Sequence, residues 1–267
     1  SAVINEMHRA VAEKHTQMKQ QIAYFQKQGK LQYFQGAAKF LSPHTIDVDM
    51  GEGKHHAIHA DHAVLAIGSR PRYLPNIPID EKTILTSDGI ASLTDFPRSI
   101  VILGAGVIGC EFATIFSNYR KTKVYLIDKE ERILPFEDED ISHAVASNLE
   151  RNGVVIHHGA SLEKMSIVDG KVEYILNYKD GRHEILTVEK ALISVGRVAN
   201  TDNLGLDAAG VALNDRGFVD DEDTQTNVSH IYAVGDLTAD ISLVNVGELE
   251  GRYAIEKMFG DPQHELV

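Results

Sequence analysis

The sequence predicts an α/β fold, and three observations support this prediction. After Pro97, short apolar runs alternate with amphipathic segments, which is the pattern of consecutive βαβ units. The turn between the first such strand and helix, at residues 104–109, is rich in glycine. The length of 267 residues, with 43% apolar and 24% charged residues, suits one large or two moderate folded domains.

The composition argues against several classes of function. The chain has 26 Lys and Arg against 39 Asp and Glu, a net charge of −13 with no basic block, which argues against nucleic-acid binding. The longest apolar runs, such as residues 100–103, are far shorter than the ~20 residues that span a bilayer. Neither end has the pattern of a leader peptide. Cys110 is the only cysteine in the sequence, so no intrachain disulfide can form. We therefore expect a cytoplasmic protein whose partner is a small molecule, with no membrane association.

The first 97 residues predict one long helix followed by small strands. Apolar residues of the opening segment recur at helical spacing before Gly29, which ends the helix: Met7, Val11, Met18, Ile22 and Phe25. Between residues 31 and 64, short alternating pieces with turns at 42–43 and 51–53 predict antiparallel strands. A buried strand at 63–67 then leads into an irregular, proline-rich connection.

The rest of the chain predicts strands and helices in alternation. The expected strands are 100–103, 123–127, 154–157, 171–178, 183–188, 191–195 and 231–234. The expected helices are 107–118, 139–152 and one running through 250–258. Asp180-Gly181 predicts the turn of a hairpin, and the acidic residues 137–140 predict a helix N-terminus rather than a pair of catalytic carboxylates.

The strongest motif is the glycine-rich turn between the strand at 100–103 and the helix at 107–118. We expect Gly104 to form the tight turn, Gly106 to let the backbone approach a pyrophosphate, and Gly109 to let helix and strand pack closely. This is the pattern of a Rossmann-type dinucleotide site. The residues expected at the cofactor are Gly104, Ala105, Gly106, Val107, Ile108, Gly109 and, one helical step further, Glu111.

Asp128 ends the second strand, where a carboxylate can accept hydrogen bonds from the ribose hydroxyls of an adenine nucleotide. A 2′-phosphate beside this carboxylate would be repelled, so NAD(H) is favoured. Lys129 and Arg132 follow at once and could offset the repulsion, so NADP(H) stays open. The alternative is a tight turn with an incidental surface aspartate.

Two other groups of side chains are interpreted as structural. A lone thiol inside a close-packed glycine turn is a small buried hydrophobe rather than a nucleophile, and this applies to Cys110. The histidines occur in two clusters without the spacing of a metal site, and we expect them on polar hairpin surfaces: His55, His56, His59, His62, His157 and His158.

Four segments together resemble the flavin-dependent pyridine nucleotide-disulfide oxidoreductase superfamily: residues 66–71 (AIGSRP), 104–111 (GAGVIGCE), 196–201 (GRVANT) and 231–236 (IYAVGD). The resemblance implies a Rossmann-type NAD(P)-binding domain inserted in part of an FAD-binding domain. The implied divisions are a partial FAD-binding domain at 1–97, the NAD(P)-binding domain at 98–199 and a return to the FAD-binding domain at 200–267. It also implies Gly68, Ser69 and Asp236 at FAD, the last on the ribityl chain, and Gly196 at the nicotinamide nucleotide.

Within the superfamily the sequence is most similar to the soluble pyridine nucleotide transhydrogenases, with the dihydrolipoamide dehydrogenases close. The first implies hydride transfer from NAD(P)H through FAD to a second pyridine nucleotide, and the second implies exchange of electrons with a cysteine pair. Two family features do not occur in the sequence: the first glycine-rich βαβ, which a Cys-x4-Cys pair follows in the disulfide-active members, and the C-terminal dimerisation domain. The resemblance therefore implies the middle of a longer enzyme that is a homodimer or higher oligomer.

That interpretation leaves a further possibility, a module that binds NAD(H) without catalysis. Residues 244–246 (VNV) stand where relatives have small residues against the flavin. Half of the implied FAD site is also outside the sequence. We therefore expect the chain by itself to bind FAD weakly and to be inactive.

Overall fold

The computed structural model describes residues 2–119 and 121–260. Contacts divide the chain into two compact units, residues 1–17 with 71–196 and residues 18–70 with 197–267. Each unit is described by itself. The boundaries predicted at 97 and 199 stay predictions, although the strand at Ile84–Thr86, which precedes residue 97, pairs with the strand at Lys190–Ile193 in the first unit.

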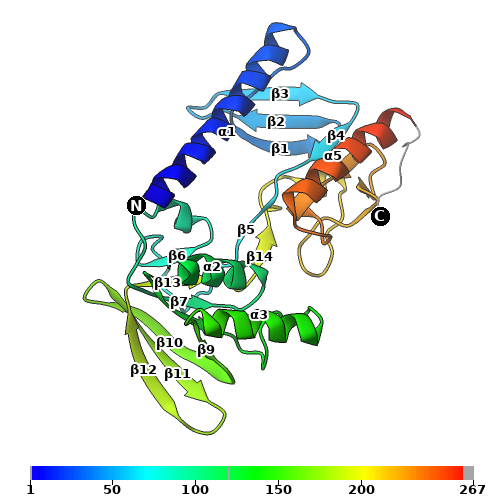
Figure 1. Cartoon of the computed structure of the whole chain (residues 1–267). Helices are drawn as coiled ribbons and strands as arrows, with labels where there is room; N and C mark the ends of the chain where they lie inside the picture. The colour runs from blue at the N-terminus through cyan, green and yellow to red at the C-terminus, as the bar shows by residue number, and fades with distance from the viewer. Residues whose placement is uncertain (1, 120, 261–267) are drawn as a thin grey trace. The chain divides into compact units, whose positions relative to one another are not determined.

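The first unit is built on a five-stranded, wholly parallel sheet, in the order β6-β13-β7-β8-β9. Its strands are β6 (Ile84–Thr86), β7 (Ser99–Leu103), β8 (Lys123–Ile127), β9 (Val155–His157) and β13 (Lys190–Ile193). The helices α2 (Val107–Asn118) and α3 (Glu139–Arg151) lie side by side in this unit, and a short 3₁₀ helix η1 (Gly89–Ser92) follows β6 (Figure 1). This confirms the predicted α/β class and the alternation after Pro97.

Strand β7 shows why the sequences of the central strands are continuous runs of apolar residues. Ile100 and Ile102 pack in the cluster that contains residues of α2 and α3. Val101 and Leu103 pack in a second cluster, with residues of a three-stranded antiparallel sheet. Both faces of the parallel sheet are therefore covered, so every position along β7 favours an apolar side chain.

The antiparallel sheet, β10-β11-β12, contains one strand that the sequence analysis missed. Its strands are β10 (Ala160–Val168), β11 (Lys171–Tyr178) and β12 (His183–Val188), drawn as three long arrows in Figure 1. The register of β10 shifts between Leu162 and Lys164, and this bulge interrupts the alternation that marks a strand. The short strand β6 was also missed.

The second unit contains three small sheets and parts of the helical structure. Its strands are β1 (Ala37–Ser42), β2 (Thr45–Asp49), β3 (His55–His59), β4 (Ala63–Leu65), β5 (Ser69–Pro71), β14 (Arg197–Ala199), β15 (Asp221–Glu222), β16 (Gln225–Thr226) and β17 (Ile231–Ala233). Its helices are α4 (Leu206–Ala209), η2 (Gly235–Leu237) and α5 (Val244–Phe259), and the contact division falls inside α1 (Ala2–Lys27). The sheet orders are β1-β2-β3, β15-β16-β17-β4 and β14-β5.

The pairing of β4 with β17 is parallel, with Ala63 opposite Ile231 and Leu65 opposite Ala233. The two segments that follow these strands therefore leave the sheet at the same edge. The long first helix and the antiparallel strands before residue 64 are confirmed. The helices found in residues 2–119 and 121–260 include no candidate for a membrane-spanning segment.

Candidate functional site

The glycine turn of the first unit has the backbone geometry that the motif predicts. Gly104 has a φ of +101°, and a side chain there would overlap the carbonyl oxygen of Ser194 at the end of β13. A side chain on Gly109 would overlap the carbonyl oxygen of Gly104 itself. Only glycine therefore allows β7, the turn and α2 to approach this closely.

Gly106 is different, because a Cβ built on it meets no atom within 4 Å. It is the N-cap of α2, with φ −75° and ψ −170°, so it needs no left-handed conformation. Val107, the first residue of α2, is exposed. The glycine at 106 thus leaves an open space in front of a helix N-terminus, where backbone N–H groups and the helix dipole favour an anion.

The carboxylate of Asp128 lies against this turn. Its Oδ2 accepts the backbone N–H of Ala105 at 2.6 Å, and its Oδ1 accepts the N–H of Glu130 at 2.9 Å. A carboxylate has about four lone-pair sites, so two remain available to other donors such as ribose hydroxyls. The structure therefore brings Asp128 and residues 104–109 together, as expected of a dinucleotide site.

Gly196 follows β13, the strand that pairs with β7, and Ser194 between them contacts the turn. The N–H of Ser194 donates to Leu103 O at 2.8 Å, and Ser194 Oγ donates to Gly104 O at 2.9 Å. Gly196 itself has a φ of +109° and accepts the N–H of Arg72 at 3.0 Å. Glu111 is exposed on α2 and Ile108 is half-buried.

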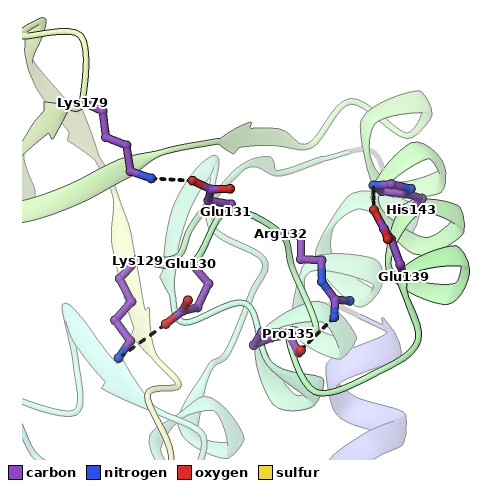
Figure 2. Close-up of a pocket in the computed structure, with 8 residues that line it drawn as sticks. All are labelled: Lys129, Glu130, Glu131, Arg132, Pro135, Glu139, His143 and Lys179. Carbon is purple, nitrogen blue, oxygen red and sulfur yellow. Dashed lines mark hydrogen bonds and ion pairs between the residues drawn. The ribbon is translucent and has the colours of Figure 1, made fainter.

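A hollow of about 690 Å³ lies in the same unit, with the residues that follow Asp128 in its lining. Most of its lining is charged: Lys129, Glu130, Glu131, Arg132, Pro135, Glu139, His143 and Lys179 (Figure 2). Three of these side chains are near acids, with Lys179 at 2.6 Å from Glu131, Lys129 at 3.6 Å from Glu130, and His143 at 3.9 Å from Glu139. Arg132 instead donates to Pro135 O, which Figure 2 shows as a dashed line.

Cys110 is buried behind the turn, as predicted for a structural thiol. Its Sγ lies 3.4 Å from Ala105 O, and burial together with the charges of Asp128 and Glu111 raises its pKa to about 12. The thiolate that a nucleophile requires is therefore strongly disfavoured.

The second unit contains a separate cluster of polar side chains at the edge where β4 and β17 end. Ser69 Oγ donates to Asp236 Oδ2 at 2.8 Å. Arg197 Nε donates to Ser69 Oγ at 2.6 Å and lies 3.7 Å from Asp236 Oδ2. Two of the predicted FAD residues are therefore in direct contact, held by a cation.

Gly68 joins this cluster through the backbone. It has a φ of +65°, and its carbonyl accepts the N–H of Asn200 at 3.0 Å where β5 and β14 pair. The sequence analysis did not single out Arg197 by itself. It lies next to Gly196 in a quoted segment, but its contacts with Ser69 and Asp236 depend on strands far apart in sequence.

One histidine is not where the sequence analysis placed it. His55, His56, His59 and His62 are exposed, but His157, expected on a polar hairpin surface, is only 8% exposed at the end of β9. Its Nδ1 donates to Tyr178 Oη at 2.7 Å, Tyr178 donates to Glu184 at 3.2 Å, and burial lowers the pKa of the imidazole. The position is buried because the antiparallel sheet, including the missed β10, covers this face.

Residues 1–251 match the family model described as pyridine nucleotide-disulphide oxidoreductase. The soluble pyridine nucleotide transhydrogenase of Serratia proteamaculans is 37% identical over 233 residues, which cover 87% of this chain and 49% of that protein. A dihydrolipoyl dehydrogenase of Bacillus subtilis is 34% identical over 255 residues, covering 92% of this chain and 53% of that protein.

Among solved structures, the HOCl-induced flavoprotein disulfide reductase RclA of Escherichia coli superimposes with a TM-score of 0.85. It is 26% identical, and the match covers 98% of this chain and 58% of that one. The chain thus spans about half the length of the relatives that it matches.

Proposed function

The chain belongs to the pyridine nucleotide-disulphide oxidoreductase family, and from this membership we propose that it is part of a flavin-dependent soluble transhydrogenase. The intact enzyme would transfer a hydride from NAD(P)H through FAD to a second pyridine nucleotide. FAD and NAD(P)H are the cofactors of the family. The observation that carries the proposal for this chain is the open space at Gly106, in front of α2 and beside Asp128.

The residues of the first unit fit a dinucleotide. A pyrophosphate needs close approach to the backbone and several N–H donors, and Gly106 with the first turn of α2 offers both. The free lone pairs of Asp128 suit the ribose hydroxyls, and its charge favours NAD(H) over NADP(H). Glu111 and Gly196 would line the path toward the nicotinamide.

The residues of the second unit fit the ribityl chain of FAD. Asp236 presents a carboxylate that Ser69 and Arg197 orient, and such a group can accept hydrogen bonds from sugar-like hydroxyls. FAD, when bound, supplies the hydride chemistry, and the protein supplies orientation. The Ser69 and Arg197 contacts would fix the Asp236 carboxylate before the cofactor arrives.

Two alternatives follow from the comparisons and from the length matched. Dihydrolipoyl dehydrogenase and a flavoprotein disulfide reductase are also among the relatives, so electrons could pass to a disulfide rather than to a nucleotide. A module that binds NAD(H) without catalysis is the second alternative, because the match covers about half of each relative.

One experiment separates these proposals. The 267-residue chain is titrated with NADH, and the longest open reading frame that contains it is purified and supplied with NADPH and either thio-NAD⁺ or lipoamide. We expect the chain to bind NADH and the longer protein to reduce thio-NAD⁺ faster than lipoamide. Faster reduction of lipoamide would favour the disulfide reductase, and binding of NADH without either reaction would favour the module. A chain that does not bind NADH would contradict the nucleotide site itself.

A further inference from the structure

Arg132 lies next to the candidate nucleotide site but is directed into its own loop. Its Nη1 donates its two N–H groups to Ser142 Oγ at 2.6 Å and to Glu137 O at 2.8 Å, and Leu134 O lies 3.4 Å from the same nitrogen. Its Nη2 donates to Pro135 O at 3.0 Å. One guanidinium therefore joins four oxygens of the segment between β8 and α3, and all four are uncharged.

The segment that Arg132 holds is attached to the glycine turn at one point. The backbone N–H of Leu134 donates to Ala105 O at 2.8 Å, and Ser142 Oγ donates to Leu134 O at 3.0 Å. Leu134 has a φ of +47°, which is costly for a residue with a side chain. This backbone geometry persists only where the surrounding contacts impose it.

The contact matters because Ala105 O belongs to the peptide plane that also carries the N–H of Gly106. In a trans peptide the C=O and N–H bonds point in opposite directions, so a fixed carbonyl also fixes the N–H on the far side. Leu134 fixes the carbonyl of this peptide, and Asp128 fixes the N–H of the peptide before it. The orientation of the Gly106 N–H, the donor at the open space, is thus set by both contacts.

We propose that Arg132 is a positioning residue for nucleotide binding, which holds the 132–142 segment so that Leu134 orients the Ala105–Gly106 peptide. The inference rests on the proposed dinucleotide site. It also assigns Arg132 a role different from that of a cation for a 2′-phosphate, because its donors are directed at loop oxygens. Lysine could not replace it, since a single ammonium group cannot reach four divergent acceptors as a planar guanidinium does.

The test compares Arg132→Lys and Arg132→Gln with Arg151→Gln, whose side chain donates to Ser147 O within α3 and, among the described residues, does not contact the 132–142 segment. We expect both Arg132 variants to raise the Kd of NADH by about fivefold to tenfold, because the turn must be ordered on binding. The Kd of NADPH should rise by the same factor. Amide hydrogen exchange at residues 105, 106 and 134 should also accelerate in the free protein. Arg151→Gln should change none of these.

Several outcomes would overturn the inference. Wild-type affinity in Arg132→Lys would show that charge alone suffices, and a loss confined to NADPH would show direct contact with the phosphate. If Arg132→Gln does not fold, Ser142→Ala removes the hydroxyl that bridges Arg132 and Leu134, and it must then give the exchange and affinity changes. If wild type itself does not bind NADH, the proposed function fails, and the exchange measurement then shows separately whether Arg132 orders the Ala105–Gly106 peptide.

Discussion

The carboxylate of Asp128 accepts the backbone N–H of Ala105 at 2.6 Å, so the acid that ends β8 closes the glycine turn that follows β7. The two strands are neighbours in a parallel sheet, and their carboxyl ends meet at one edge. The bond of Asp128 to Ala105 orders the turn, and we propose that the remaining lone pairs of this carboxylate accept hydrogen bonds from a ribose.

Gly106→Val is expected to weaken nucleotide binding strongly while the fold survives. A Cβ at this position meets no protein atom within 4 Å, so the branched side chain would occupy the space that a pyrophosphate needs. We expect the Kd of NADH to rise by more than about tenfold, which corresponds to ~1.4 kcal/mol. Fluorescence titration measures the affinity and thermal unfolding reports the fold.

Gly109→Ala in the same motif is the control for Gly106→Val. Its Cβ would overlap the carbonyl oxygen of Gly104, so this smaller substitution should lower the free energy of unfolding by about 1–3 kcal/mol. If Gly106→Val bound NADH as tightly as wild type, the pyrophosphate would not lie at this turn. If Gly109→Ala were as stable as wild type, the close approach of α2 would be relieved at little cost.

Asp128→Ser should narrow the preference for NADH over NADPH and also weaken NADH itself. The substitution removes the charge that repels a 2′-phosphate together with the acceptor that Ala105 uses. The ratio of the two Kd values should fall by about fivefold, the size of an exposed charge interaction of ~1 kcal/mol. Lys129 is exposed and can meet the phosphate, whereas Arg132 is bonded to its own loop.

Titrations of both nucleotides into wild type, Asp128→Ser and the control Glu131→Gln measure this effect. Glu131 is an exposed acid of the same hollow that pairs with Lys179. A wild type that binds both nucleotides equally would mean that Asp128 does not face the ribose.

Asp221→Asn in the second unit should stabilise the protein at neutral pH but not in acid. Burial raises the pKa of this carboxyl from 3.8 to about 6, with smaller contributions from Asp240, Glu250 and Asp220. The pKa of Asp221 is higher in the folded protein than in the unfolded chain. Protonated Asp221 therefore contributes its full stability below pH 3.8, and this contribution is lost as the pH rises through about 6.

For this half-buried group, screening by solvent reduces the expected gain to about 1 kcal/mol at pH 7.5. The Asn side chain still accepts the N–H of Thr224, which donates to Asp221 at 2.9 Å. Urea unfolding at pH 7.5 and pH 4 tests this, with the exposed Asp215→Asn as the control. An equal gain at both pH values would show that charge is not the cause.

The 267-residue chain should purify with little FAD. A flavin dinucleotide is held chiefly by its pyrophosphate at a glycine turn, and the turn with that geometry among the described residues is 104–109 in the first unit. Charge-assisted bonds to Asp236 would contribute ~1.5–3 kcal/mol, below the ~8 kcal/mol of a micromolar complex. The visible absorbance spectrum decides this, and stoichiometric flavin would contradict it.

Much of the candidate nucleotide site could be predicted from the sequence because it is encoded locally. The glycines of residues 104–109, the helix that follows and the acid at the end of the next strand lie within one βαβ unit. Strand β10 was missed because a bulge at 162–164 breaks its alternation. His157 was placed on the surface because no local signal shows that a distant sheet covers it.

The sequence by itself determined the elements whose causes lie within a few residues: the glycine turn, the helices with apolar stripes and the buried strands. Only the tertiary structure decided which side chains meet. Ser69 contacts Arg197 and Asp236 across 128 and 167 residues of chain, through pairings of β5 with β14 and β4 with β17. From the sequence, Arg132 could have been a cation for a 2′-phosphate. In the fold, its guanidinium donates to oxygens of its own loop. The physical reason is that propensity and periodicity act between neighbours, whereas a hydrogen-bond partner is set by strand order and packing.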